Sequence, residues 1–480
     1  MSPVATGSSG AAGHPRAFLG FVHRQRRGAE LFLLILALIV GIGAYAAVGL
    51  GVQGEVPTDI VTYGGWLAAI ILAAHIVVRL TAPYADPVLL PLVAALNGLG
   101  LAVIHRLDLA YKAAGRLEDD FAQRQLIWMT LGVMLFIGTL LLLRDHRLLQ
   151  RFTYTFGLTA IALLLLPMIP GLGTTINGAR IWIRVGGFSF QPGEVAKVVL
   201  VIAFAGYFVA HRDALALAGR RLLFVDLPRG RDLGPIVVMW LISLGVLVFQ
   251  RDLGSSLLFF GLFLVMLYVA TERPGWLLVG GSLFAVGAYA AYRAFGHVES
   301  RVNIWLDPMG YYDQTGGSYQ IVESMFGMAW GGLIGRGFGN GSPERIPFAE
   351  SDFIIGAIGE ELGLTAVMAV LVCYGLIVER GLRTALVCRD GFGKLVATGL
   401  ACALALQVFV VVGGVTKLIP LTGLTTPFLS YGGSSLVANW VILALLLRIS
   451  DQARRPVPDL SDDTDTLLPD NETTQVVKLT

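Results

Sequence analysis

The sequence predicts an all-α, polytopic membrane protein with about twelve transmembrane helices. Hydrophobic residues make up 55% of its 480 residues and charged residues only 14%, and the mean hydropathy is +0.72. A bilayer core about 30 Å thick requires about 20 apolar residues per helix, and stretches of that size recur along the chain. The net charge of +2 gives no reason to expect nucleic acid as a partner.

The apolar stretches are separated by short polar or basic segments. Two stretches within 30–85 form an additional N-terminal pair, and ten more fall within a membrane core at 86–455. The polar ends, 1–29 and 456–480, have little to bury and are expected to be disordered. In chain order the expected helices lie near 30–50, 60–80, 86–105, 125–144, 152–170, 193–210, 233–249, 253–271, 275–295, 353–378, 396–416 and 433–449.

The distribution of Lys and Arg predicts the orientation in the membrane. Basic residues concentrate before the first helix and near 144–147, 212–232 and 380–394. Such segments face the cytoplasm, so both termini of this multi-pass membrane protein are expected there. The opposite, extracytoplasmic side then receives 106–124, 171–192, the large loop 296–352, and 417–432.

Carboxylates gather where the helix expected at 353–378 begins, in "IPFAESDFIIGAIGEELG". Asp352 lies where the loop meets the helix, and Ser351 is the expected N-cap. The positive helix end favours the ionised form of Asp352. These features make Asp352 a candidate for chemistry at the membrane surface.

The other acids of this stretch have different expected roles. Glu350 precedes the helix and is expected to be a mobile rim residue. Glu360 and Glu361 are about two turns deeper, where carboxylates are costly and need partners, and Lys197 is a candidate. We interpret both as structural support.

Three further motifs contain polar groups on the outer side. In "FQPGEVAK", Glu194 and Lys197 are three residues apart and can pair on one helix face, as a neutralised structural pair or in direct contact with substrate. Asp252 in "QRDLGSS" is mainly a helix-capping signal. Pro420 and Pro427 interrupt helix in 413–435 and predict a folded loop.

Seven motifs along the chain resemble, in their residues and their order, those of the SEDS family of RodA and FtsW peptidoglycan glycosyltransferases. Their residues are most similar to those of the actinobacterial RodA branch. The resemblance covers 86–455. Gly193 and Lys417 depart from it, because the family commonly has serine at the first position and a small residue at the second. The motifs are "NGARIWI", "FQPGEVAK", "DLG", "YQIVES", "GFGNG", "SDFIIGAIGEELG" and "PLTGLTTPFLSYGGSS".

The resemblance implies an inverting enzyme that polymerises lipid II into β-1,4 glycan strands at the outer face of the membrane and releases undecaprenyl pyrophosphate, for elongation and cell shape or for division. The alternative is a flippase or transporter of lipid-linked oligosaccharides. A transporter places its site near the midplane, whereas the motifs here cluster at one surface, which favours the enzyme.

The reaction needs a base for the attacking hydroxyl and positive charge for the leaving group. Asp352 is the predicted catalytic base. The pyrophosphate would be held by outer-side cations, alone or with a divalent ion such as Mg²⁺ or Mn²⁺, although the sequence identifies no metal ligands. The substrate-binding candidates are Arg180, Glu194, Lys197, Arg336, Arg345, Lys417 and Ser430, with Arg184 as a further cation.

Several partners follow from the same resemblance. They are lipid II, the nascent glycan strand, a class B penicillin-binding protein that cross-links the product, and other elongasome or divisome membrane proteins.

Overall fold

The computed structural model describes residues 27–116, 120–176, 178–185, 188–212, 220–222, 225–227, 230–314 and 316–456. Its long helices are α1 (Arg27–Val52), α2 (Ile60–Thr81), α3 (Leu89–Ala113), α4 (Phe121–Leu142), α5 (Thr153–Leu165), α6 (Pro192–Ala210), α8 (Gly230–Phe249), α9 (Leu253–Thr271), α10 (Gly275–Ala294), α14 (Gly363–Val387), α15 (Gly391–Val415) and α16 (Gly433–Arg454). Shorter helices between α10 and α14 are α11 (Gly296–Leu306), α12 (Tyr319–Gly331) and α13 (Ile354–Glu361).

The prediction of an all-α polytopic membrane protein is confirmed. Within the described residues, 11 helical segments are long and apolar enough to cross a membrane, and α8 adds the shorter apolar segment Gly234–Phe249. Together they correspond to the twelve predicted stretches. The segment predicted at 152–170 is a composite, because 3-10 turns at His146–Phe152 and Leu166–Met168 flank α5.

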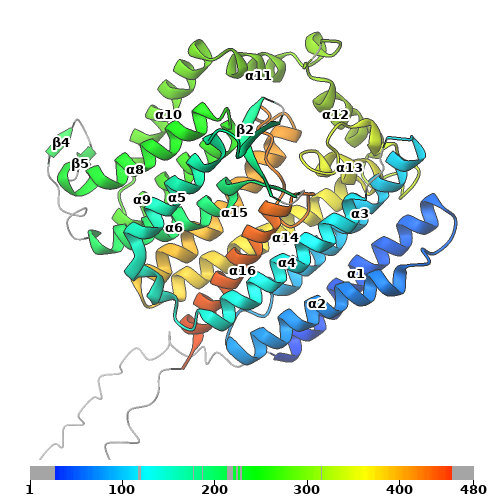
Figure 1. Ribbon diagram of the computed structural model, residues 1–480, viewed down its shortest axis with the longest axis horizontal. Helices are drawn as coiled ribbons and strands as arrows, with labels where there is room; N and C mark the ends of the chain where they lie inside the picture. The colour runs from blue at the N-terminus through cyan, green and yellow to red at the C-terminus, as the bar shows by residue number, and fades with distance from the viewer. Residues whose placement is uncertain are drawn as a thin grey trace, which may run out of the picture.

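The N-terminal hairpin of α1 and α2 lies at the edge of the bundle against α3 and α4 (Figure 1). Small residues let α1 approach α3 closely, since a Cβ added to Gly41 would lie 2.8 Å from the Cα of Gly98. α1 begins at Arg27, three residues before the start predicted near residue 30. The predicted disorder of the remaining N-terminal residues and of 457–480 concerns residues outside the described part.

α16 lies in the centre of the bundle and is almost wholly buried (Figure 1). Its Trp440 is fully buried and packs edge-to-face on Phe136 of α4. A Cβ added to Gly132 would lie 2.7 Å from the Trp440 ring, so glycine leaves room for the indole. This packing holds the N-terminal end of α16 in place under the loop that precedes it.

The outer segment predicted as a loop at 171–192 folds instead into a small antiparallel sheet. Its strands are β1 (Gly173–Ile176), β2 (Ala179–Val185) and β3 (Phe188–Phe190), in the order β1-β2-β3. β2 pairs with both neighbours, with Ile183 opposite Gly173 and Phe190. Polar and apolar residues alternate in "ARIWIRV", which is typical of a strand. The sequence prediction missed this strand because it considered only stretches long enough for a membrane helix. A second pair, β4 (Arg220–Leu222) and β5 (Val225–Leu227), lies between α6 and α8.

The helix predicted at 353–378 is two helices, which corrects the sequence interpretation. α13 ends at Glu361 and α14 begins at Gly363, which has a φ of +78°. A Cβ added to Gly363 would lie 2.3 Å from the amide nitrogen of Gly335, so only glycine fits this close turn. α13 is therefore a short helix beside α12, separate from the long α14 (Figure 1).

We expect the end of the bundle that carries α11, α12 and α13 to face outward. In a background where Cys373, Cys388 and Cys402 are replaced by alanine, the exposed Gln314 changed to cysteine should react with a membrane-impermeant thiol reagent on intact cells. Arg389→Cys, exposed near the opposite end of α14, should react only after lysis. The reverse pattern would overturn the orientation derived from the basic loops.

Candidate functional site

Asp352 is half-buried in the turn just before α13. Its carboxylate faces the segment 417–432, because a Cβ added to Gly423 would lie 3.7 Å from Asp352 Oδ2. Gly423 has a φ of +75°, where glycine is favoured. The Ser351 hydroxyl donates to the Phe348 carbonyl at 3.5 Å. The predicted N-cap role of Ser351 is wrong, since the N-cap is Phe353 and no side chain caps α13.

The segment 417–432, which we call the Pro loop, is non-helical, as Pro420 and Pro427 predicted. Its buried end carries Ser430, whose Oγ accepts a hydrogen bond from the Thr426 amide at 3.0 Å. Ser430 therefore supports the loop backbone. Four surrounding helices donate side-chain hydrogen bonds to loop carbonyls: Gln125 to Ser430 at 2.9 Å, Gln407 to Thr425 at 2.9 Å, Arg301 to Leu421 at 2.7 Å, Trp305 to Lys417 at 3.1 Å, and Tyr374 to Pro427.

Arg301 is the functional residue that the sequence interpretation missed. It lies on α11, inside the segment expected to be a long loop, and its Nη1 donates to Leu421 of the Pro loop. Its charge acts on both Asp252 and Asp352, and these two carboxylates oppose the lowering of its pKa by burial. The available signal was the helix-like spacing of apolar residues in "GHVESRVNIWL", where Arg301 is the one Lys or Arg.

The pKa of Asp352 is raised to about 7, because burial and the neighbouring Glu350 together raise it more than Arg301 lowers it. The expected stabilisation of the ionised form by a helix end is thus outweighed by desolvation. A carboxylate with a pKa near neutrality is half ionised near pH 7 and can accept a proton during a reaction. Asp352 has the protonation behaviour of a general base.

Asp252 is the second carboxylate whose charge acts on Arg301. As predicted, it caps a helix: its Oδ1 accepts a hydrogen bond from the Ser255 amide at 2.9 Å at the start of α9. Burial raises the pKa of Asp252, and the charge of Glu194 raises it further. Arg301 therefore balances two carboxylates, Asp252 and Asp352, that come from separate segments of the chain.

Glu194 and Lys197 form the predicted ion pair, with Nζ 2.8 Å from Oε2, and both are buried. Lys197 also donates to the Gln407 side chain at 2.6 Å, and Gln407 in turn donates to Thr425 of the Pro loop. This chain of contacts favours the structural alternative over direct substrate contact. Lys197 is accordingly not the partner of Glu360 or Glu361, and that expectation is wrong.

Glu360 and Glu361 hold α13 against its neighbours, as their interpretation as structural support predicted. Glu361 Oε1 pairs with Arg106 Nε of α3 at 2.7 Å and accepts the Gly339 amide at 3.1 Å. Glu360 Oε1 accepts the Ser342 amide at 2.7 Å. Both side chains are buried, so these contacts compensate the cost of removing their charge from water.

Glu350 is not the mobile rim residue that we expected. Its Oε2 accepts a hydrogen bond from the hydroxyl of Tyr111 at 3.0 Å, and its carbonyl accepts the Tyr431 amide of the Pro loop at 2.7 Å. Burial raises the pKa of Glu350. Glu350 is therefore held in place near Asp352, and its charge raises the pKa of Asp352.

The remaining predicted cations do not converge on Asp352. Arg336 stacks on the Trp330 ring at 3.8 Å, and Arg345 is exposed and acts on Glu360. Lys417, with a φ of +61°, lines a separate cavity of about 410 Å³ beside α12.

Arg180 and Arg184 lie on β2. Arg184 is exposed. Arg180 donates through Nη2 to Ile169 at 3.2 Å, and its Nε is buried without a hydrogen-bond partner in the described structure. Among the predicted cations, Arg180 therefore has the clearest unused donor for an anion.

Potential metal ligands cluster once in the described part of the chain, far from Asp352. His146, Cys388 and Asp390 lie within 4.8 Å of one another beyond the C-terminal end of α14. α14 has 25 residues, so its two ends are separated by about 37 Å at 1.5 Å per residue. Within the described residues, this cluster of three ligands does not include Asp352.

Comparisons with known proteins agree with the motif resemblance. Residues 87–455 match the family model FTSW_RODA_SPOVE, described as a cell cycle protein. The chain is 50% identical over 433 residues to peptidoglycan glycosyltransferase RodA of Mycobacterium tuberculosis (strain ATCC 25618 / H37Rv), covering 90% of this chain and 92% of the relative. It is 34% identical to a probable peptidoglycan glycosyltransferase FtsW of Trichlorobacter lovleyi, covering 76% of this chain and 93% of that relative.

Solved structures also resemble the chain. A peptidoglycan synthase complex, described as coordinating polymerization and crosslinking, contains a chain that is 30% identical with a TM-score of 0.61, covering 77% of this chain and 98% of that one. Rod shape determining protein RodA of Thermus thermophilus is 26% identical with a TM-score of 0.53, covering 78% of this chain and 98% of that one.

The ion pair between Arg106 and Glu361 should stabilise the fold. Arg106→Gln leaves a buried carboxylate unpaired and should lower the free energy of unfolding by about 3–5 kcal/mol. Arg383→Gln, which removes an exposed partner of Glu379, should cost about 0–1 kcal/mol. Thermal unfolding of the purified variants in one detergent measures both. Equal destabilisation by the two changes would contradict the role given to Arg106.

Proposed function

Since this chain belongs to the family of FtsW, RodA and SpoVE cell cycle proteins, we propose that it is a peptidoglycan glycosyltransferase whose reaction takes place at Asp352. The observation that carries the assignment of the site is a half-buried carboxylate with a pKa near 7, enclosed by the Pro loop and opposed by Arg301. The resemblance to RodA favours a role in elongation and cell shape, and division is the alternative.

The proposed substrate is lipid II, and the product is a β-1,4 glycan strand. The C4 hydroxyl of one sugar attacks the anomeric carbon of another lipid-linked sugar. A new C–O bond forms, the bond to undecaprenyl pyrophosphate breaks, and the configuration inverts. The hydroxyl proton passes to Asp352, which therefore must be ionised before the step begins.

Arg301 keeps Asp352 ionised near neutral pH, because its positive charge opposes the effects of burial and of Glu350. Glu194 and Lys197 act through Gln407 on the Pro loop and so position the surface beside Asp352. For the departing pyrophosphate, Arg180 and the exposed Arg184 remain the proposed cations, in place of Arg336, Arg345 and Lys417.

The proposed divalent ion, Mg²⁺ or Mn²⁺, would be held by the oxygens of the pyrophosphate, which are ligands of the kind that Mg²⁺ prefers.

The proposed partner is a class B penicillin-binding protein, which would cross-link the glycan, together with other elongasome or divisome membrane proteins. The chain of similar fold from a complex that coordinates polymerization and crosslinking supports this proposal. Co-purification, and stimulation of glycan synthesis by the penicillin-binding protein, test it. The same proposal places the enzyme in the plasma membrane with both termini in the cytoplasm.

Asp352→Asn should yield a folded, membrane-inserted protein that still binds lipid II and makes essentially no glycan. A positioned base contributes about 10²–10⁴ in rate, and asparagine preserves the shape while removing the proton acceptor. Glu350→Gln is the matched control next to it and should keep clear activity, because an amide oxygen can still accept from Tyr111. Labelled lipid II and gel analysis of the polymer measure both. Polymerisation by Asp352→Asn near the wild-type rate would refute the assignment.

The pH dependence should report the charges around Asp352. Activity should fall as the pH drops through about 7, since Asp352 becomes protonated and its pKa is raised to about 7. Arg301→Gln removes a charge that lowers this pKa, so the acid limb should move to higher pH. Glu350→Gln removes a charge that raises it, so the limb should move to lower pH. Rate profiles of the three proteins test these opposite shifts, and shifts of the same sign would contradict the assignment of Asp352 as the titrating base.

A further inference from the structure

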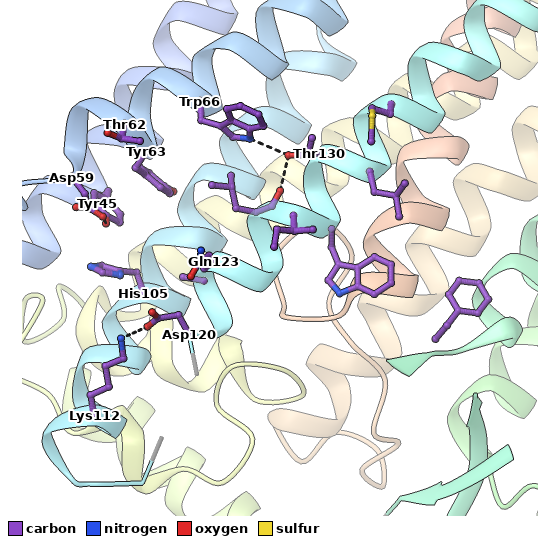
Figure 2. Close-up of a pocket in the computed structure, with 17 residues that line it drawn as sticks. Tyr45, Asp59, Thr62, Tyr63, Trp66, His105, Lys112, Asp120, Gln123 and Thr130 are labelled. Carbon is purple, nitrogen blue, oxygen red and sulfur yellow. Dashed lines mark hydrogen bonds and ion pairs between the residues drawn. The ribbon is translucent and has the colours of Figure 1, made fainter. Parts of the chain in front are cut away.

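A cavity of about 1140 Å³ lies between the N-terminal hairpin and the core, with α2 on one side and α4 on the other (Figure 2). We call it the α2–α4 groove. Its lining follows α4 from Asp120 to Met134, which corresponds to about 21 Å at 1.5 Å per residue. The groove is therefore long enough to follow much of a hydrocarbon core about 30 Å thick.

The groove has an apolar floor and a polar mouth. Leu126, Ile127, Leu131 and Met134 of α4 line the floor. One hydrogen bond joins the two sides of the groove: Trp66 Nε1 of α2 donates to Thr130 Oγ1 of α4 at 3.0 Å (Figure 2). The mouth lies where α1 and α3 end and α2 and α4 begin, and its polar lining residues include Tyr45, Asp59, Thr62, His105, Asp120 and Gln123.

The charges at the mouth do not suit a phosphate group. Lys112 is the one ammonium among the lining residues, and it is already paired with Asp120. Asp59 is a second carboxylate, and its Oδ2 accepts a hydrogen bond from the Tyr45 hydroxyl at 2.8 Å. Two carboxylates and one ammonium give the mouth a net charge of −1, which would repel an anionic headgroup.

Hydroxyl groups, in contrast, match this mouth. The side chains of Asp59, Thr62 and Gln123 offer acceptors and donors to sugar hydroxyls. Next to them the rings of Tyr45 and Tyr63 stack at 3.9 Å, and His105 lies against Tyr45 at 4.5 Å. A wall of rings beside carboxylate and amide groups presents an apolar surface and polar handles together. A ligand with a single hydroxyl would leave most of these polar side chains without a partner. A sugar has several hydroxyls and can bind several of them.

We propose that the α2–α4 groove binds one molecule of an uncharged glycolipid, a diacylglycerol that carries a sugar. Its acyl chain lies along the floor beside Ile127 and Leu131, and its sugar contacts Asp59 and Gln123 at the mouth. The site differs from that of the anionic pyrophosphate substrate in charge. It also needs the hairpin α1–α2, which lies outside the family match at 87–455.

The groove is connected to the Pro loop through one side chain. Trp128 lines the groove, and a Cβ added to Gly433 would lie 2.2 Å from the Trp128 ring. Gly433 begins α16 directly after the Pro loop. A glycolipid in the groove thus contacts the residue that packs against the end of this loop.

Native mass spectrometry of the purified, delipidated protein tests the proposal. Monoglucosyl diacylglycerol and phosphatidylglycerol with the same acyl chains are added separately. We expect one glucolipid to be retained, at a level about tenfold above phosphatidylglycerol, which is a difference of about 1.4 kcal/mol. Asp59→Asn should reduce this preference, because it removes the negative charge that disfavours phosphatidylglycerol.

Ile127→Trp should fill the floor and abolish retention of the glucolipid, and Leu131→Trp serves as a second filling variant. The matched control is Leu142→Trp on the same helix, where Leu142 is 86% exposed and outside the groove. Thermal unfolding midpoints show that each variant is folded. Equal retention of both lipids by the wild type, unaltered binding in both filling variants, or equal loss in Leu142→Trp would overturn the proposal.

Discussion

The site depends on one constraint: the backbone of the Pro loop leaves the helical pattern inside a membrane protein, so its polar groups must find partners within the protein. In a bilayer, irregular backbone is tolerated only where it is buried in protein or lines a polar cavity. Here side chains from four helices supply the donors, among them Gln125, Gln407 and Tyr374. The ion pair of Glu194 and Lys197 holds Gln407 in turn. The surface beside Asp352 is therefore held in place by side chains that hydrogen-bond to its backbone.

The charges around Asp352 follow from the same arrangement. Arg301 donates to the carbonyl of Leu421 in the Pro loop, and its charge acts on both Asp252 and Asp352. Asp352 alone, half-buried beside Glu350, would be further protonated at neutral pH. The structure of the Pro loop and the pKa of Asp352 are thus linked through Arg301, because its guanidinium group both holds the loop and lowers this pKa.

The sequence predicted the parts of the fold that depend on hydrophobic length and local spacing. Twelve apolar stretches, the pair of Glu194 and Lys197, and the cap at Asp252 needed only a count along the chain. The break at Gly363, the partner Arg106 of Glu361, and the approach of Arg301 to Asp352 depend on which distant segments pack together. Periodicity contains no information about such contacts. The fixed position of Glu350 was missed for the same reason, since Tyr111 and Tyr431 come from distant segments.

The break between α13 and α14 separates Asp352 from the part of the chain that must match the bilayer. A helix such as α14 adapts to a thicker or thinner membrane by tilting, at a cost of a fraction of a kcal/mol per ångström of mismatch. If Asp352 lay in the first turn of α14, each change in the tilt of α14 would move its carboxylate relative to the Pro loop. Because Gly363 begins a new helix, α13 is instead held by Arg106 of α3 and by the segment after α12. The position of Asp352 relative to the Pro loop therefore does not follow the tilt of α14. It is independent of membrane thickness, which differs with lipid composition and temperature.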